Sequence, residues 1–178
     1  MLPLDTFNQL LALGTIVLGV VSLGLLFEHV FRISIGSFVE QYLLWIALAA
    51  ASLGITGTLV HSYLYGLPPC PLCWWQRIFL YPQALLFAFL LWRGSSIDVR
   101  RFGFDFSILL SVIGLTIALY HHALQMFPNG TLPCPSQGEI SCAQILFLEY
   151  GFLTYPLMAA VLFAFLIVTV LHLRRANT

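Results

Sequence analysis

The sequence predicts an all-α integral membrane protein, and three observations lead to that fold class. Of the 178 residues, 60% are hydrophobic and only 8% are charged, whereas soluble domains are roughly 45–50% apolar and about 25% charged. Five stretches each approach the ~20 mostly apolar residues that a spanning helix needs. Nothing between them is long enough for a separate soluble domain. A helical bundle satisfies its backbone hydrogen bonds internally, as lipid requires.

The first two stretches run from about Leu10 to Phe27 and from Tyr42 to about Tyr65. The first stretch could be a cleaved signal peptide. However, no basic residue precedes Arg32, and no clear small-residue cleavage site lies before it. A retained spanning helix is therefore predicted.

The other three stretches run from about Leu72 to Trp92, from Phe106 to Met126 and from Tyr150 to Leu171. Arg77 lies near the start of the first of these three. An arginine at a membrane edge is a functional candidate, but it can also snorkel to lipid phosphate. Its position alone leaves both interpretations open.

The placement of the other arginines predicts the orientation. They lie between the first two stretches, between the third and fourth, and after the fifth: Arg32, Arg93, Arg100, Arg101, Arg174 and Arg175. These connections alternate across the membrane and are all expected to be cytoplasmic. The N-terminus, the segment around Cys70 and the loop 127–149 then lie outside. Seven acidic residues balance the seven arginines, so net charge indicates no nucleic-acid partner.

All four cysteines fall in the two segments expected outside, where disulfides persist. Cys70 and Cys73 form a C-x-x-C pair, whose cross-link closes a ring too small to constrain much of the unfolded chain. The spacing is that of redox dithiols and metal sites. Zinc needs further ligands, and no second C-x-x-C or H-x-x-x-H accompanies the pair. A redox dithiol is therefore favoured, and no metal is expected.

The position of Cys73 supports a redox role. It is expected at the N-terminus of the third spanning helix, where the helix dipole and free N–H groups stabilise a thiolate. Arg77 follows four residues later on the same helix face. Cys73, Gln76 and Arg77 are thus expected to form a patch at the outer lipid–water boundary.

The second pair, Cys134 and Cys142, lies in a loop rich in proline and glycine. A disulfide there would be exposed and accessible to another protein. The alternative is a structural staple on an outer loop, an interpretation that the nearby C-x-x-C pair weakens.

Three histidines are expected near the outer ends of spans: His61, His121 and His122. Intramembrane histidines are costly unless they are paired or used. Adjacent residues on a helix point in different directions, so His121 and His122 cannot both face one ligand. A hydrogen bond to a neighbouring helix is the alternative role for each, least so for His121.

The run from Cys70 to Arg77 reads CPLCWWQR and resembles the C-x-x-C-x-x-x-R signature of the DsbB family of disulfide-bond-formation proteins. Its Gln76-Arg77 ending and the Tyr81-Pro82 that follows look most like the BdbC-type branch. The resemblance covers about Tyr42 to Leu171. It implies a four-helix transmembrane redox bundle in 36–178 and one additional N-terminal transmembrane helix in 1–35.

The resemblance also implies an activity. Proteins of this family are membrane thiol:quinone oxidoreductases of the bacterial cytoplasmic membrane. They reoxidise a thioredoxin-like partner of the DsbA or BdbD type outside the cytoplasm and pass the electrons to a quinone, ubiquinone or menaquinone. By similarity, the catalytic residues would be Cys70, Cys73, Cys134, Cys142 and Arg77.

The same resemblance assigns roles within that set. Cys73, Arg77 and His121, with Gln125 one turn beyond, would lie at the quinone, and Cys134 would form the mixed disulfide with the partner. The segment Ile140–Leu148 is expected to lie flat on the membrane.

Three other functions compete with this hypothesis. A transporter is one, but the spans carry few charges and the sequence shows no visible inverted repeat. A thiol oxidoreductase of the vitamin K epoxide reductase type also combines a bundle, loop cysteines and C-x-x-C. There, however, the C-x-x-C lies late in the bundle, whereas here it precedes the loop pair. A non-enzymatic membrane scaffold with two structural disulfides leaves Arg77 and the helix-start position of Cys73 unexplained.

Overall fold

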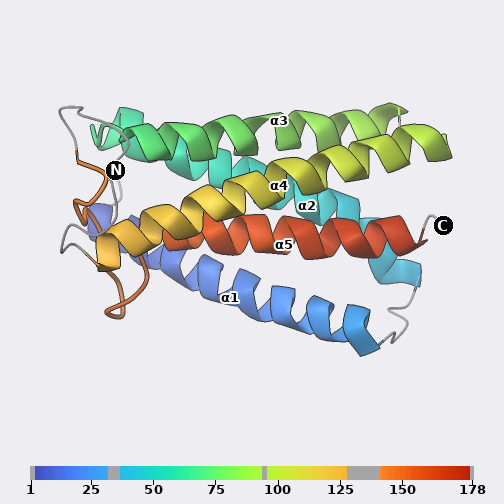
Figure 1. Ribbon diagram of the computed structural model, residues 1–178, viewed down its shortest axis with the longest axis horizontal. Helices are drawn as coiled ribbons and strands as arrows, with labels where there is room; N and C mark the ends of the chain where they lie inside the picture. The colour runs from blue at the N-terminus through green and yellow to red at the C-terminus, as the bar shows by residue number, and fades with distance from the viewer. Residues whose placement is uncertain (1–2, 32–36, 94–95, 128–140, 177–178) are drawn as a thin grey trace.

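The computed structural model describes residues 3–31, 37–93, 96–127 and 141–176. The described chain forms a bundle of long helices that run roughly parallel or antiparallel to one another (Figure 1). Their order along the chain is α1 (Leu4–Phe31), α2 (Ser37–Leu59) with a π-helical extension η1 (Val60–Leu64), α3 (Pro71–Arg93), α4 (Ile97–Met126) and α5 (Tyr155–Ala176). The all-α membrane fold predicted from composition is confirmed.

Four of the described helical segments are long and apolar enough to cross a membrane: Leu4–Phe31, Tyr42–Leu64, Ile97–Met126 and Tyr155–Arg175. Helix α3 has a similar length but is less apolar. Its polar residues Gln76, Arg77 and Gln83 are buried within the bundle. The lower apolarity of α3 therefore reflects polar side chains that face protein, and α3 lies lengthwise in the bundle beside α4 (Figure 1).

Four of the five described helices begin five or more residues from the predicted starts of the apolar stretches: α1 at Leu4 and α2 at Ser37 begin earlier than Leu10 and Tyr42, and α4 and α5 also differ. Helix α4 starts at Ile97 rather than Phe106, because the Ser96 hydroxyl accepts a hydrogen bond from the backbone N–H of Val99 and caps the helix. Helix α5 starts at Tyr155 rather than Tyr150. Tyr150 and Gly151 have φ angles of 53° and 78°, so the chain turns there before the helix can begin.

The core lies between α2, α3, α4 and α5. Its largest fully buried side chains include Phe87 of α3, Phe104 of α4, and Phe163 and Phe165 of α5. Helix α1 lies at one side of the bundle, where it packs mainly against α5 (Figure 1). Its buried residues are few, and all but the last are small or polar: Asn8, Ala12, Ser22 and Leu25.

The end of α2 widens into the π-helical turn η1, which carries His61. Such turns displace carbonyl groups from the regular hydrogen-bond ladder and are frequent at functional sites. This one lies across from the start of α3, and the two together form the polar end of the bundle.

Candidate functional site

The beginning of α3 is built around Cys70. Pro71 is the first helical residue, a position where the missing N–H costs nothing. Cys70 precedes it as the capping residue, and its sulfur accepts a hydrogen bond of 3.3 Å from the backbone N–H of Cys73. The Trp74 N–H donates to the Cys70 carbonyl at 3.1 Å. The local sequence thus places both sulfurs at the positive end of a helix.

The two sulfurs face each other. The Cys70 thiol donates to the Cys73 sulfur across 2.9 Å, whereas a disulfide bond measures about 2.05 Å. The pair is therefore a dithiol that small side-chain movements would close. The neighbouring Cys73 sulfur, together with burial, raises the pKa of Cys70 to about 12. Cys70 is thus the protonated member of the pair, and Cys73 receives its hydrogen bond.

His121 of α4 lies against this pair and is 1% exposed. Its Nε2 atom is 3.1 Å from the Cys142 carbonyl and 3.6 Å from the Cys70 sulfur. Its Nδ1 atom is 3.0 Å from Gln76 Nε2. Since the Gln76 amide donates to Nδ1, the hydrogen on Nε2 is directed at the carbonyl. Both ring nitrogens therefore contact protein groups, and the ring is held beside the sulfurs.

Arg77 is 8% exposed and does not snorkel outward. Its Nη2 atom donates to the Thr58 carbonyl at 3.0 Å and to the Ser62 hydroxyl at 2.6 Å. The guanidinium also lies 5.3 Å from the centre of the Trp74 ring. Arg77 thus joins α3 to the π-helical end of α2. The expected patch at the lipid boundary is instead a buried one, because Gln76 and Arg77 both find polar partners inside the bundle.

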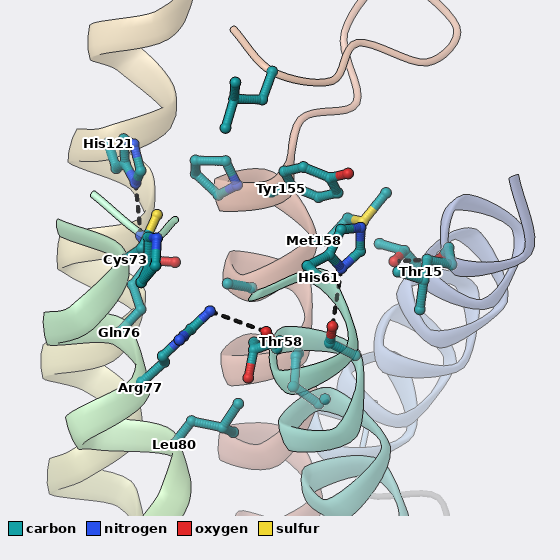
Figure 2. A pocket seen from close by; sticks show the side chains of 18 of the residues that line it. Thr15, Thr58, His61, Cys73, Gln76, Arg77, Leu80, His121, Tyr155 and Met158 are labelled. Carbon is teal, nitrogen blue, oxygen red and sulfur yellow. Dashed lines mark hydrogen bonds between the residues drawn. The ribbon is translucent and has the colours of Figure 1, made fainter. Parts of the chain in front are cut away.

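A cavity of about 500 Å³ opens beside these residues. Its polar end includes Cys73, Gln76 and Arg77 of α3 and His121 of α4. Figure 2 shows these side chains on one side and His61, Tyr155 and Thr15 across from them. Most of the remaining lining is apolar. This size and this mixture are typical of small-molecule sites.

Gln125 of α4 also lines the cavity. It is 7% exposed, and its amide nitrogen donates to the Gln144 carbonyl at 3.1 Å. Its Oε1 atom is buried and has no hydrogen-bond partner among the residues that the structure describes. This oxygen is closed off from the cavity, so the contribution of Gln125 to the lining comes from the rest of its side chain.

The second cysteine pair is described in part. Cys142 is 1% exposed and packs in one cluster with Cys70, Leu72 and Leu124, against Cys73. The segment 141–148 contains turns and no helix. Cys134 lies outside the described residues. The fold therefore brings one cysteine of the loop to the C-x-x-C pair, and Cys142 is buried rather than exposed as expected, because it packs against the start of α3.

The two remaining histidines take the alternative role predicted for them. The His122 Nδ1 atom lies 2.8 Å from the Thr154 hydroxyl. His61 Nε2 lies 3.0 Å from Asn8 Oδ1, and the Tyr155 hydroxyl donates to the same oxygen at 2.9 Å. Sequence reasoning missed Asn8 and Tyr155. The one available signal was a polar Asn8 just ahead of the first apolar stretch.

Within the part of the chain that the structure describes, one group of ligand atoms could hold a metal ion. The sulfurs of Cys70 and Cys73 and a ring nitrogen of His121 all lie within 4.8 Å of one another. The sequence showed no third ligand near the C-x-x-C pair, because His121 is 48 residues beyond Cys73 and only the packing of α4 on α3 brings it there.

Comparisons with known proteins agree on one family. A family model described as disulfide bond formation protein DsbB matches residues 40–173. The chain is 31% identical over 123 residues to the probable disulfide formation protein C 1 of Bacillus cereus, covering 68% of this chain and 84% of that protein. It is 37% identical over 111 residues to the SPbeta prophage-derived disulfide bond formation protein B of Bacillus subtilis, covering 62% and 71%. No solved structure matches the chain significantly.

Proposed function

Because the chain belongs to the DsbB family of disulfide bond formation proteins, we propose that it oxidises a thiol partner and delivers the electrons to a membrane quinone. The chain is a multi-pass membrane protein of disulfide bond formation. The observation that carries the finer proposal is the placement of Cys73 and Arg77, one helical turn apart, at the polar end of a cavity within the bundle.

The residues present fit a quinone. The cavity is largely apolar and of a size suited to a small ring. The polar groups at one end of the cavity, Cys73, Gln76 and Arg77, could contact the polar edge of a quinone ring. Cys73 and Arg77 would lie nearest the ring, with His121 held behind the sulfur pair. When bound, a quinone supplies an acceptor for two electrons and two protons.

The protein's own part is thiol–disulfide exchange. A reduced partner dithiol attacks the disulfide of Cys134 and Cys142, which leaves the partner oxidised and the loop pair reduced. The loop dithiol then reduces the Cys70–Cys73 disulfide and is itself reoxidised. The resulting dithiol of Cys70 and Cys73 gives up two electrons and two protons. Arg77 stabilises negative charge that develops beside Cys73.

The same proposal includes the redox partner and the membrane face on which the cysteines lie. The partner is a thioredoxin-like thiol oxidase of the DsbA or BdbD type, and it meets the cysteines on the extracytoplasmic face of a bacterial cytoplasmic membrane. The packing of Cys142 against the C-x-x-C pair supports exchange between the two pairs. A scaffold with two structural disulfides is disfavoured, because it leaves unexplained why Cys73 and the buried Arg77 both line one cavity at the start of α3.

Quinone reduction by the purified protein tests the proposal. We expect a reduced thioredoxin-like dithiol to drive it, and Cys73→Ser to abolish it while the variant remains folded. His122→Ala is the matched control, because His122 bonds Thr154 and does not line the cavity. Full turnover in the Cys73→Ser variant, or no quinone reduction by the wild type, would overturn the proposal.

A further inference from the structure

Helix α1 lies outside the matched family region, which begins at residue 40. It nevertheless packs closely on α5. Ala12 is fully buried, in one cluster with Phe147 and Leu153 of the segment that leads into α5. A Cβ added at Gly19 would lie 3.7 Å from Val161 of α5. Small residues thus let the two helices approach, as is usual for helix pairs in lipid.

A buried polar contact fixes the outer end of α1. Asn8 is 5% exposed and lies between His61 of η1 and Tyr155 of α5, with its Oδ1 atom 3.0 Å and 2.9 Å from their polar atoms. The His61 and Tyr155 rings meet edge to face at 4.5 Å between centroids, and Phe7 packs on His61. This contact holds α1 in one register against the polar end of the bundle.

Around and after Asn8 along the chain, α1 forms a wall of the cavity. Six residues from three successive turns line it: Phe7, Leu10, Leu11, Gly14, Thr15 and Leu18. Helix α2 contributes Ala50, Leu53 and Gly57. Among the described residues, α1 makes hardly any close backbone approach to α2. The cavity therefore extends as an apolar slot between α1 and α2.

The slot opens toward lipid. Leu10 of α1 and Leu53 of α2 both line it, yet they are 55% and 70% exposed. Both lie within segments apolar enough to span the membrane, so the opening faces hydrocarbon rather than water. The other end of the same cavity reaches Cys73 and Arg77.

We propose that α1 and α2 form the binding slot for the polyprenyl tail of the quinone, and that α1 thereby completes the substrate site of this protein. This inference rests on the proposed function. A ligand with a polar redox ring and a long apolar tail matches a cavity that is polar beside Cys73 and apolar toward a lipid-facing opening. A phospholipid acyl chain would fit the slot but has no redox ring to place beside Cys73.

Gly14 offers a substitution that should block the slot without disturbing the fold. A Cβ at Gly14 meets nothing within 4 Å, and Gly14 lines the cavity. Gly24 is the matched control on the same helix, since a Cβ there also meets nothing within 4 Å but Gly24 is not part of the lining. Replacing either glycine by leucine changes helix propensity in the same favourable direction.

The test compares a polyprenyl quinone with a tail-less quinone that has the same ring. We expect Gly14→Leu to raise the KM for the tailed quinone about tenfold, because the blocked slot forfeits the dispersion contacts of part of the tail. The KM for the tail-less quinone should stay within about twofold, since the contacts at the ring are unchanged. Gly24→Leu should change neither value. Equal KM values for the tailed quinone in Gly14→Leu and wild type would overturn the inference.

A second measurement, photocrosslinking, detects binding of the quinone tail to α1 directly. A quinone with a photoreactive diazirine in its tail should crosslink to residues 7–18 of α1 in the wild type and much less in Gly14→Leu. Crosslinks confined to other helices would also overturn the inference, as would preferential crosslinking of the slot by a diazirine phospholipid. If the wild type reduces neither quinone, the proposed function itself fails. If it reduces both and Gly14→Leu behaves as wild type, only the role of α1 fails.

Discussion

Cys70 has two roles at the residue scale, and they are connected. It caps α3 through its sulfur, and it forms one half of the dithiol. Because its thiol donates to Cys73, the hydrogen-bond direction within the pair distinguishes two residues that the C-x-x-C motif leaves equivalent. Cys73 is also the more accessible of the two, since Cys70 is 5% exposed.

Alkylation of the reduced protein should reveal this asymmetry. The pKa of Cys70 is raised from 9.0 to about 12, so its thiolate fraction near neutral pH is about a thousandfold smaller than that of an ordinary thiol of pKa 9.0. Only the thiolate reacts with iodoacetamide. We expect peptide mapping after brief labelling at about pH 8 to find Cys73 modified well before Cys70, with Cys70 labelling rising only as pH approaches about 12. Equal labelling at both positions would contradict this order.

The contacts of the Arg77 side chain depend on the extended shape of its guanidinium group. Its Nη2 atom donates to both Thr58 and Ser62, while its central carbon Cζ lies over the Trp74 ring. A lysine ammonium could make these two hydrogen bonds, but it is a point charge and cannot extend over Trp74 at the same time as a guanidinium does.

We therefore expect Arg77→Lys to lower kcat/KM for quinone about tenfold or more, equivalent to roughly 1.4 kcal/mol of transition-state stabilisation. Arg93→Lys is the matched control. Arg93 also lies over a tryptophan, at 5.0 Å from the Trp92 ring centre, but it is at the opposite end of α3. Steady-state quinone reduction distinguishes the two variants, and equal kinetics for both would show that the charge alone suffices.

The sequence could predict the part of the site that lies on one helix. Cys73 and Arg77 are one turn apart, so helix geometry alone puts them on one face. The partners of the site could not be predicted in this way. Gln76 and His121 are 45 residues apart, and Asn8 and Tyr155 are 147 apart. Such contacts depend on how the helices pack, which periodicity and spacing do not determine.

At the element scale, the bundle is held by close helix approaches at glycine. Gly114 of α4 lies directly against the ring of Phe163 of α5, which is fully buried. A Cβ at Gly114 would clash with three atoms of that ring. In lipid, such packing replaces the hydrophobic force that drives helix association in water.

Gly114→Ala should therefore destabilise the protein despite the better helix propensity of alanine. Propensity favours alanine by up to about 1 kcal/mol, whereas overpacking against an immobile ring costs about 1–3 kcal/mol. We expect a lower midpoint of thermal unfolding in detergent for Gly114→Ala. Gly24→Ala, where a Cβ meets nothing within 4 Å, should be neutral or slightly stabilising. A higher midpoint in Gly114→Ala than in Gly24→Ala would contradict the packing argument.

The helix ends show what hydropathy could not predict. Hydropathy marks the part of a helix that lies in hydrocarbon, so it began the fourth span at Phe106. The helix itself continues back to Ile97, since Ser96 caps it and Arg100 and Arg101 are compatible with helix beyond the apolar run. Helix α5, in contrast, begins later than hydropathy predicted, because Gly151 has a positive φ within an apolar segment. Hydropathy carries no information about backbone angles.

At the scale of the whole molecule, positive charge is unevenly distributed along the bundle. Among the described residues, Arg93, Arg100, Arg101, Arg174 and Arg175 lie at the ends of helices opposite the cysteines (Figure 1). Arg174 and Asp105 form an ion pair of 3.0 Å there, which contributes little because both side chains are about half exposed. Arg77 lies at the other end and is buried. This uneven distribution is the one expected if the arginine-rich end stays in the cytoplasm.

Thiol accessibility in cells should report the orientation. In a background with all four cysteines replaced by serine, we would place single cysteines at Asp98, in the exposed first turn of α4, and at Tyr150, which is 57% exposed in the turn before α5. Because the arginine-rich end should remain in the cytoplasm, a membrane-impermeant maleimide should label Tyr150→Cys in intact cells and Asp98→Cys only after permeabilisation. The reverse pattern would place Cys70, Cys73 and Cys142 on the reducing side. A disulfide relay to an extracytoplasmic partner would then be impossible, however well the cavity fits a quinone.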